Sequence, residues 1–235
     1  MAKVVRKVKN AAVLDDGTIR VSNVRLSHPH LDKPYKGDDD KGVAKYGVVG
    51  MLPKKTHKEA VKLIEEEIAA LMKTNKVKAL PSEKKFLRDG DESAKDEYEG
   101  HWTISAREER RPILKEMTED GDLVLVEQED AKETFYGGCW GSLLIRPWFQ
   151  DNKYGKRVNA GLSAVTKKAD DEAFGQGRIS EEEVDQAFED DDELDMPRRG
   201  SSSKDKSRYE DEDEDEDDKP RRRRRARDED DDEDL

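Results

Sequence analysis

Alternating hydrophobic and polar positions predict β-strands along much of this chain. In residues 19–28, Val24 and Leu26 share one parity, and the stretch lies between an Asp-Gly turn and a proline that we expect to end the strand. Residues 32–42 are polar and predict a turn or loop. The next run, residues 43–52, is rich in apolar residues and predicts a buried strand that also ends at a proline.

One segment has helical spacing instead. Thr56 and Glu59 form a capping-box pattern, and apolar residues recur every three or four positions up to about Met72. The sequence therefore predicts one amphipathic helix here. Residues 75–100 are mostly polar and include a proline, which predicts an extended and partly mobile loop.

The second half of the chain again favours strands. Alternation or short apolar runs predict strands at residues 101–106, 123–126, 135–149 and 157–165. Four residues of the last strand are expected to share one face: Val158, Ala160, Leu162 and Ala164. A capping-box pattern from Ser180 to Glu183 predicts a short helix that ends near Phe188.

About six strands at irregular spacing, with one substantial helix, indicate a mainly β domain. This pattern is typical of a small closed or partly open barrel rather than of a parallel sheet. We therefore predict an OB-like barrel of five to six strands. A two-layer β-sandwich is the alternative, because alternation alone does not distinguish it from a barrel.

Acidic charge is concentrated at the C-terminal end. Residues 189–235 contain 23 of the 58 acidic residues and 12 of the 45 basic ones, a net charge of −11 that leaves −2 for residues 1–188. Large apolar side chains are too sparse in this segment to offset the entropy lost on folding, so we predict a disordered acidic tail. The predicted organisation is an N-terminal arm (1–18), an OB-fold domain (19–170), a short helical segment (171–188) and the tail (189–235).

Composition and motifs exclude several classes of function. Cys139 is the only cysteine, which excludes an intramolecular disulfide or a cysteine-based zinc cluster and suits a reducing cytoplasm. Residues 1–10 have a basic start without an apolar run, so we expect neither a signal peptide nor a membrane span. Motifs for phosphate-binding loops, zinc proteases and serine hydrolases are absent, and we expect no enzymatic activity and no cofactor.

Two weaker sequence signals are better explained by loop residues than by a metal site or a catalytic site. His28 and His30 are spaced like paired metal ligands, but no third ligand is evident, and we predict no metal site. Asp89, Asp91 and Glu92 are the nearest candidate for a nuclease carboxylate set, and they lie in a predicted loop.

Basic side chains interleaved with aromatic ones are the main functional signal. Single-stranded nucleic acid is bound by cations that neutralise phosphates and by flat apolar faces on which bases stack. The chain carries four such sets, which together favour binding to a polyanion. The candidates are Lys33, Tyr35, Lys45 and Tyr46; Arg107, Arg110 and Arg111; Trp140, Arg146 and Trp148; and Lys153, Tyr154, Lys156 and Arg157, with Trp102 as a further aromatic.

The segment with two tryptophans shows both the signal and its alternative. Trp140 and Trp148 share a parity with Arg146, whereas Leu143 and Ile145 take the other parity and are expected in the core. A barrel also buries tryptophan, so packing is the alternative role for both aromatic rings. Lysines and arginines at strand ends, likewise, are often only solvating residues.

The order of several short motifs resembles a known family. The motifs are VRLSHP (24–29), KYGVVGMLPK (45–54), YGGCW (136–140) and YGKRVNAGL (154–162), with the predicted helix between the second and the third. Over about residues 19–170 the chain resembles a family of tailed-phage single-stranded-DNA-binding proteins. Its architecture, a barrel followed by an acidic tail, is also similar to that of the T7-type phage protein.

The resemblance implies an OB-fold that binds single-stranded DNA without sequence preference in phage replication, recombination and repair, within the cytoplasm of the infected bacterial host. It implies no enzymatic activity, and it suggests the acidic tail as a contact for a phage or host polymerase or helicase. The tail departs from the T7-type pattern, because it ends at Leu235 without a terminal aromatic residue and contains the arginine block 221–225.

Partitioning the charge suggests a role for the tail as well. An acidic segment attached to a near-neutral domain is expected to compete with DNA for the basic surface. The alternative is a protein-interaction module, in which an acidic, DNA-mimicking tail binds basic partners and the β-domain is only a scaffold.

Overall fold

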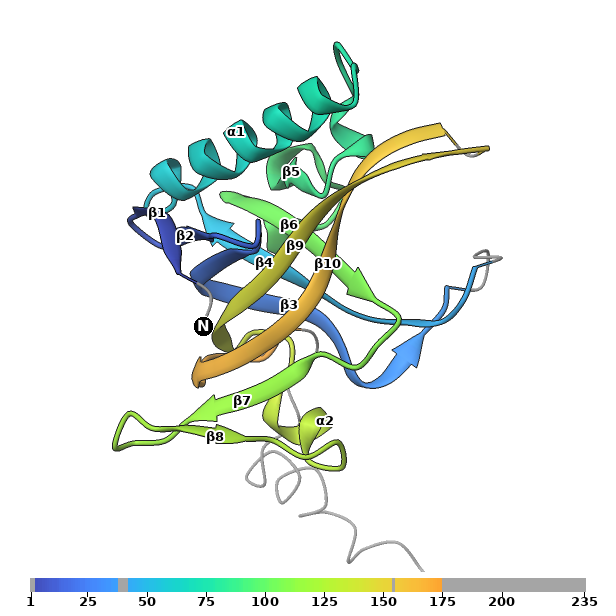
Figure 1. Cartoon of the computed structure of the whole chain (residues 1–235). Helices are drawn as coiled ribbons and strands as arrows, with labels where there is room; N and C mark the ends of the chain where they lie inside the picture. Colours follow the sequence, from blue (N-terminus) through green and yellow to red (C-terminus); the bar gives the residue numbers. More distant parts are fainter. Residues whose placement is uncertain (1–2, 38–41, 154, 175–235) are drawn as a thin grey trace, which may run out of the picture. The chain divides into compact units, whose positions relative to one another are not determined.

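Five strands close into a barrel (Figure 1). Each neighbouring pair is antiparallel except β6 and β10, which run parallel and pair through Ala106 and Ala160. The closed five-stranded barrel confirms the predicted OB-like fold and not the two-layer sandwich. Around the barrel the order is β3 (Ile19–Tyr35), β4 (Lys45–Pro53), β6 (His101–Glu108), β10 (Gly155–Ala169) and β9 (Trp140–Asn152), which pairs again with β3.

The remaining elements extend or cover this barrel. The structure, a computed structural model, describes residues 3–37, 42–153 and 155–174, so the predicted helix from Ser180 and the acidic tail lie outside the described residues. No helix among the described residues is long and apolar enough to cross a membrane. The further elements are β1 (Val4–Val8), β2 (Ala11–Leu14), α1 (Lys58–Thr74), β5 (Leu87–Asp89), β7 (Ile113–Met117), β8 (Leu123–Leu125), α2 (Ala131–Thr134) and 3-10 turns at Ser82–Lys84, Gly90–Glu92 and Asp96–Tyr98.

Residues 4–14 form a hairpin that continues the sheet beyond β3, whereas the sequence placed residues 1–18 outside the barrel domain as an arm. The turn between β1 and β2 uses Asn10 with a φ of 64°, in the left-handed region that asparagine tolerates. Ala11 and Ala12 are buried at 4% and 0% exposure. Two small residues give little hydrophobic alternation, which is why the sequence pattern did not reveal this hairpin.

Aliphatic side chains from the barrel strands and from α1 fill the interior. Val24 and Leu26 on β3 and Leu143 and Ile145 on β9 are fully buried, as their parity predicted. Helix α1 lies across the upper end of the barrel in Figure 1, and its apolar stripe, from Ala60 to Met72, is buried. The helix therefore closes this end of the barrel and completes the hydrophobic core.

Helix α1 begins differently from its prediction. Its N-cap residue is His57 and no side chain caps the first turn, so the capping box of Thr56 and Glu59 was wrong. The buried His57 ring lies with Nε2 3.0 Å from the carbonyl oxygen of Ser22 on β3. Glu59 accepts a hydrogen bond from the backbone N–H of Lys9 at 3.3 Å instead. The helix start is thus held by contacts with β3 and the β1–β2 turn.

Strand β3 continues to Tyr35, past Pro29, where it was predicted to end. Asn23 and His28 have φ values of 56° and 46°, and at both places the pairing of β3 with its neighbours shifts register. Such bulges bend a strand and interrupt its ladder. Pro29 is tolerated because it lies in the interrupted part, where no ladder hydrogen bond from its nitrogen is needed. The polar residues predicted as a loop are therefore partly strand.

Residues 75–100 pack against the barrel, whereas the sequence predicted an extended, partly mobile loop. Phe86, Leu87 and Tyr98 are buried, and β5 pairs with β6. The high proportion of charged residues in this segment, which suggested solvent exposure, includes several that form contacts within the fold.

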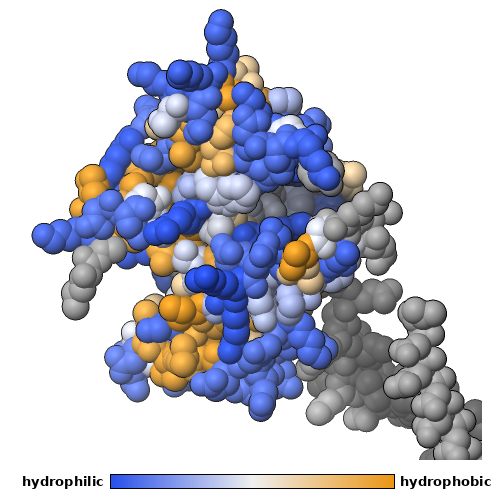
Figure 2. Space-filling model, turned by 45° about the vertical axis from the view of Figure 1, so that its right-hand side comes forward, coloured by the Kyte–Doolittle hydropathy of each residue, from blue (hydrophilic) through white to orange (hydrophobic). Residues whose placement is uncertain are grey.

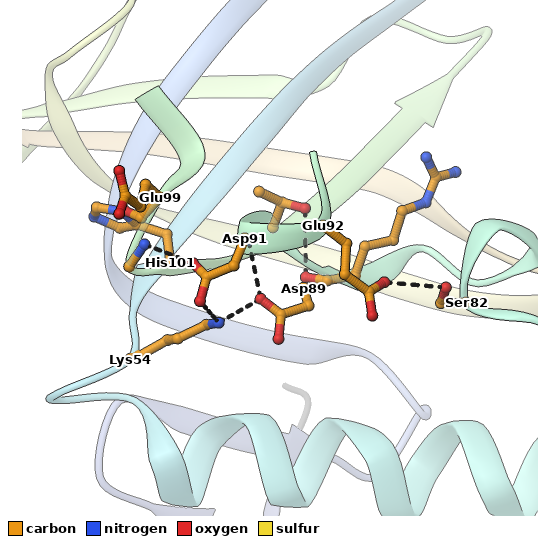
Figure 3. A network of polar contacts seen from close by, with 10 residues as sticks. Lys54, Ser82, Asp89, Asp91, Glu92, Glu99 and His101 are labelled. Carbon is orange, nitrogen blue, oxygen red and sulfur yellow. Dashed lines mark hydrogen bonds and ion pairs between the residues drawn. The ribbon is translucent and has the colours of Figure 1, made fainter. Parts of the chain in front are cut away.

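One such network joins the segment to the end of β4 (Figure 3). The Lys54 ammonium donates to the Asp89 carboxylate and to Asp91 Oδ2, the latter at 2.6 Å. Asp91 also accepts a hydrogen bond from the backbone N–H of Gly100 at 2.7 Å. The hydrogen bond from Lys54 lowers the pKa of Asp91, and those to Asp89 and Asp91 raise the pKa of Lys54.

A bulge in β10 also changes one predicted core position. Pairing with β9 shifts between Leu162 and Ala164, so that Ser163 is the extra residue. Val158, Ala160 and Leu162 are buried as predicted, but beyond the bulge Val165 replaces Ala164 on the buried face. One inserted residue is enough for this change, because side chains alternate along a strand.

Candidate nucleic-acid interface

Two strand pairs extend beyond the barrel on the same side (Figure 1). One is the end of β3 with the start of β4, residues 30–35 and 45–47, and the other is the end of β9 with the start of β10, residues 147–152 and 155–160. The C-terminal end of β6 lies between them in Figure 1. In an OB barrel, the second and third strands and the loops of these two hairpins form the ligand-binding surface. We refer to them as the first and second hairpins.

The first hairpin presents an aromatic stack. The rings of His30 and Tyr35 have centroids 4.3 Å apart and are nearly parallel, at 12°, and Tyr35 is 52% exposed. Burial, together with the nearby positive charge of Arg107, lowers the pKa of His30 below its ordinary 6.5, so the ring is mainly neutral near pH 7. Tyr35 is paired across the hairpin with Lys45. An exposed ring beside a cation is the combination that a stacked base and its phosphate require.

Arg107 extends this set onto β6. Gly47 on β4 lies opposite both His30 on β3 and Arg107 on β6. A Cβ atom at Gly47 would lie 3.1 Å from Cγ of Arg107, so a glycine leaves room for the aliphatic part of the arginine against the strand. The exposed Arg107 therefore lies one strand away from His30, on the far side of β4.

The second hairpin carries an exposed tryptophan beside polar groups. Trp148 on β9 is 42% exposed and pairs with Asn159 on β10. The Asn159 amide donates to Gln150 Oε1 at 2.8 Å, and Arg157 pairs with Gln150. This hairpin therefore offers a flat ring, amide groups and a guanidinium within one short length of two strands.

Several candidate cations form ion pairs only in exposed positions. The pairs are Lys45–Glu109 at 3.3 Å, Lys156–Asp151 at 3.5 Å and Arg146–Asp16 at 3.3 Å, with all six side chains 38–60% exposed. Exposed pairs of this kind contribute about 0–1 kcal/mol, so a phosphate can replace the carboxylate at little cost. Within the described ranges, Lys33, Arg107, Arg110 and Arg157 have no ion-pair partner.

Trp102 lies apart from these two hairpins. It shares the inward parity of Ile104 on β6 and lines a pocket of about 670 Å³ together with α1. The Lys54 ammonium lies 5.1 Å from its ring centroid. The structure therefore does not bring Trp102 together with Tyr35 and Trp148.

Trp140 and three of the arginines also lie away from the hairpin tips. Trp140 is eight positions from Trp148, about 26 Å along an extended strand, and its indole N–H donates to Asp171 at 2.6 Å. Arg110 and Arg111 lie in the connection from β6 to β7. Arg146 is held beside Asp16 in the turn between β2 and β3.

The remaining candidates belong to the two hairpins. Lys33 and Tyr46 lie on the first, Lys153 and Lys156 on the second, and Tyr154 is outside the described residues. Sequence reasoning missed His30 as an interface residue and did not include Asn159 or Gln150. His30 had no usable signal, because its stack on Tyr35 depends on the irregular register of β3; Asn159 and Gln150 could have been found from their outward parity.

This surface offers stacking and charge rather than a reactive group. Burial raises the pKa of the Cys139 thiol to about 11, so it is protonated at neutral pH. Asp89 and Asp91 are occupied by Lys54. In the part of the chain that the structure describes, no group of three or more metal-ligating side chains comes together.

The fold and the position of the two hairpins define an OB-fold protein, a class whose members bind oligonucleotides and oligosaccharides on this surface. The family model for the Enterobacter phage Enc34 ssDNA-binding protein matches residues 17–195, and the chain belongs to this family. The resemblance seen in the sequence motifs is thereby confirmed.

Individual relatives agree with this placement. Putative protein p50 of Acyrthosiphon pisum secondary endosymbiont phage 1 is 30% identical over 182 residues, covering 71% of this chain and 92% of the relative. Two structures of the single-stranded DNA-binding protein from bacteriophage Enc34 align with a TM-score of 0.68 at 45% identity, covering 74% of this chain and 98% of theirs. One of them is a C-terminal truncation, and the other is in complex with ssDNA.

Proposed function

We propose that this protein binds single-stranded DNA without sequence preference on the surface formed by the two hairpins and β6. The observation that carries the proposal is an exposed ring with a cation close by on each hairpin. Tyr35 pairs with Lys45, and Trp148 and Arg157 lie in neighbouring positions of the β9–β10 ladder, where they pair with Asn159 and Gln150. Every base has a face that can stack, and phosphate contacts carry no sequence information, so this combination favours sequence-independent binding. Family membership and the ssDNA complex of the Enc34 relative support the same activity.

The relatives are phage proteins, which supports a role in phage DNA metabolism. We infer that the protein coats and protects single strands during phage DNA replication, recombination and repair, in the cytoplasm of the infected bacterium. The proposed activity is binding without catalysis and without a cofactor.

We further propose that the acidic residues 189–235 compete with DNA for the hairpin surface. A flexible coil of 47 residues has an r.m.s. span of about 35–40 Å. The remaining 188 residues, folded as one domain, have a radius of gyration of about 16 Å. Such a segment can reach its own domain at an effective concentration of order millimolar. When DNA displaces it, the segment becomes available to a phage or host polymerase or helicase.

Titration of oligo-dT over a series of salt concentrations tests the DNA-binding proposal. We expect the intrinsic tryptophan emission to be quenched, and the logarithm of the affinity to fall with the logarithm of salt at about −0.7 per phosphate contacted. Arg107→Ala should reduce this slope by about 0.7 if the guanidinium contacts one phosphate.

The outcome also distinguishes the alternative function. A protein-interaction module with a scaffold barrel would leave the emission unchanged and show no salt-dependent binding. Failure of a folded protein to bind oligo-dT at low salt would therefore reject the proposal.

A further inference from the structure

Exposed hydrophobic side chains gather at the two ends of the sheet. Nine large hydrophobic residues are exposed in the described part of the chain. Six of them, 48–69% exposed, lie on the outermost strand pairs: Val4 and Val5 on β1, Ile113 on β7, and Leu123, Val124 and Leu125 on β8. An orange patch is visible in the lower part of Figure 2, where Figure 1 places β7 and β8. Tyr35 and Trp148, on the proposed DNA surface, are separate from these.

The exposed strand β8 also has an unpaired backbone edge. Among the strands of the described residues, the sheet path begins at β1 and ends at β8, so each of these two has a strand neighbour on one side only. Hydrogen bonds between Thr118 and Asp122 and between Val126 and Leu114 set the alternation of the β7–β8 ladder. By that alternation the N–H and C=O groups of Leu123 and Leu125 point away from β7. Exposed apolar edges of this kind are usually blunted by charge or covered by a partner.

Charges around the two ends of the sheet are opposite in sign. Residues 118–130, which contain β8, have six acidic residues and no basic ones: Glu119, Asp120, Asp122, Glu127, Glu129 and Asp130. Residues 3–9, which contain β1, have four basic residues and no acidic ones: Lys3, Arg6, Lys7 and Lys9. Pairing β8 with β8 of a second copy would place like charges together, whereas pairing β8 with β1 places opposite charges together.

We propose that the β7–β8 hairpin of one copy packs against β1 of a second copy, head to tail along a shared DNA strand. A contact between two different surfaces leaves one surface of each type free at the ends of the assembly. Unless the rotation between neighbouring copies closes the assembly into a ring, it therefore generates an open row of protomers. Such a row matches a linear ligand. The exposed valines and leucines supply the apolar centre of the contact, and the flanking charges set its direction.

The inference rests on the proposed DNA binding, because the contact is small. Two strands of three to five residues bury much less than the roughly 1,000 Å² of a stable interface. Copies bound side by side on one strand have a high effective concentration, which is sufficient for a weak contact to form. The expected result is a protein with little self-association alone and cooperative binding on long single strands.

Charge reversal at exposed positions tests the pairing. We expect Asp122→Lys/Glu127→Lys, or Lys3→Glu/Lys7→Glu, to reduce cooperativity on long oligo-dT about tenfold or more while leaving affinity for a single-site oligonucleotide nearly unchanged. A protein with all four substitutions should recover cooperativity, because the charges are again opposite. Leu125→Ser, which shortens an exposed side chain, should also reduce cooperativity and does not depend on charge.

A matched control and the possible outcomes separate this inference from the proposed function. Glu83→Lys/Asp96→Lys makes the same change in net charge as Asp122→Lys/Glu127→Lys, but at exposed turns, and should leave cooperativity unchanged. Binding to the short oligonucleotide without cooperativity on the long one overturns the head-to-tail contact but not the DNA binding. No binding to either oligonucleotide rejects the proposed function itself. Loss of cooperativity without recovery in the fourfold variant also overturns the β1–β8 pairing.

Discussion

At the scale of single residues, orientation on the strand separates tryptophans that look alike in the sequence. Both Trp148 and Trp102 lie on barrel strands near basic residues. Trp148 points outward on the second hairpin, whereas Trp102 shares the inward parity of Ile104 and contacts the pocket beside α1. Of these two tryptophans, only Trp148 is therefore expected to stack on a base.

This difference gives a paired prediction for DNA binding. Trp148→Ala should weaken binding to oligo-dT by about 1–3 kcal/mol, which is roughly five- to 150-fold, because one stacked base is lost. Trp102→Phe retains an aromatic ring in the pocket and should leave the affinity unchanged. Fluorescence anisotropy of a labelled oligonucleotide measures both, and an equal loss in the two variants would contradict the assignment.

His57 makes the stability of the fold depend on pH. The ring is 1% exposed, and its Nε2–H donates to the Ser22 carbonyl oxygen at 3.0 Å. Burial lowers the pKa of His57 below its ordinary value of 6.5. The unfolded chain therefore takes up a proton on this ring at a higher pH than the folded chain does. The stabilisation by neutral His57 is complete above about pH 6.5 and is lost progressively as the pH falls.

Urea unfolding at a series of pH values checks this expectation. The free energy of unfolding should decrease between pH 7 and pH 5, and His57→Asn should show a shallower decrease, although its stability at pH 7 will be lower. A slope identical to that of the unmodified protein would show that His57 does not contribute. The half-buried His30, whose pKa is also lowered, contributes in the same direction and remains present in both proteins.

At the scale of elements, alternation predicted the barrel strands but not their limits. The core parity of β3 and β9 and the amphipathic helix were confirmed, because these depend on residues close together in the chain. The β1–β2 hairpin, the extension of β3 and the packing of residues 75–100 were missed. In each case the deciding contact comes from another segment. The N–H of Ser22 donates to Asn10 in the β1–β2 turn, the extended part of β3 pairs with β4, and β6 pairs with β5.

Gly90 is a point where two parts of this packed segment approach closely. A Cβ atom there would lie 2.2 Å from the carbonyl oxygen of Tyr98 and 2.5 Å from that of His101. Both are backbone atoms, so relief requires the segment to move away from the barrel. Gly90→Ala should lower the free energy of unfolding by about 1–3 kcal/mol.

The matched control for this substitution is Gly37→Ala. No atom lies within 4 Å of a Cβ built at Gly37, and stability there should be unchanged within about 0.5 kcal/mol. Urea denaturation of the two variants gives the comparison. Equal stability of the Gly90 and Gly37 variants would mean that residues 85–100 shift without cost.

At the scale of the whole molecule, the segregated charge predicts control of binding by the acidic segment. Removal of residues 189–235 takes away a net charge of −11 and should tighten binding to oligo-dT by about fivefold or more at low salt. It should also reduce the preference for single-stranded over double-stranded DNA. Without the acidic segment as a competitor, double-stranded DNA, the weaker ligand, also gains access to the hairpin surface. Unchanged affinity at low salt would contradict competition, and the difference should shrink as salt screens the charges.

By itself the sequence determined the class of fold, which face of each main strand is buried, and the concentration of acidic charge in residues 189–235. Each of these properties depends on the pattern of residues close together in the chain or on composition. Tertiary structure decided which candidates share a surface. Strand pairing and the bulges of β3 bring Tyr35, Arg107 and Trp148 to the hairpin side of the barrel, and they leave Trp102 under α1 and Trp140 at the far end of β9. Register between distant strands is a long-range property that local alternation does not contain.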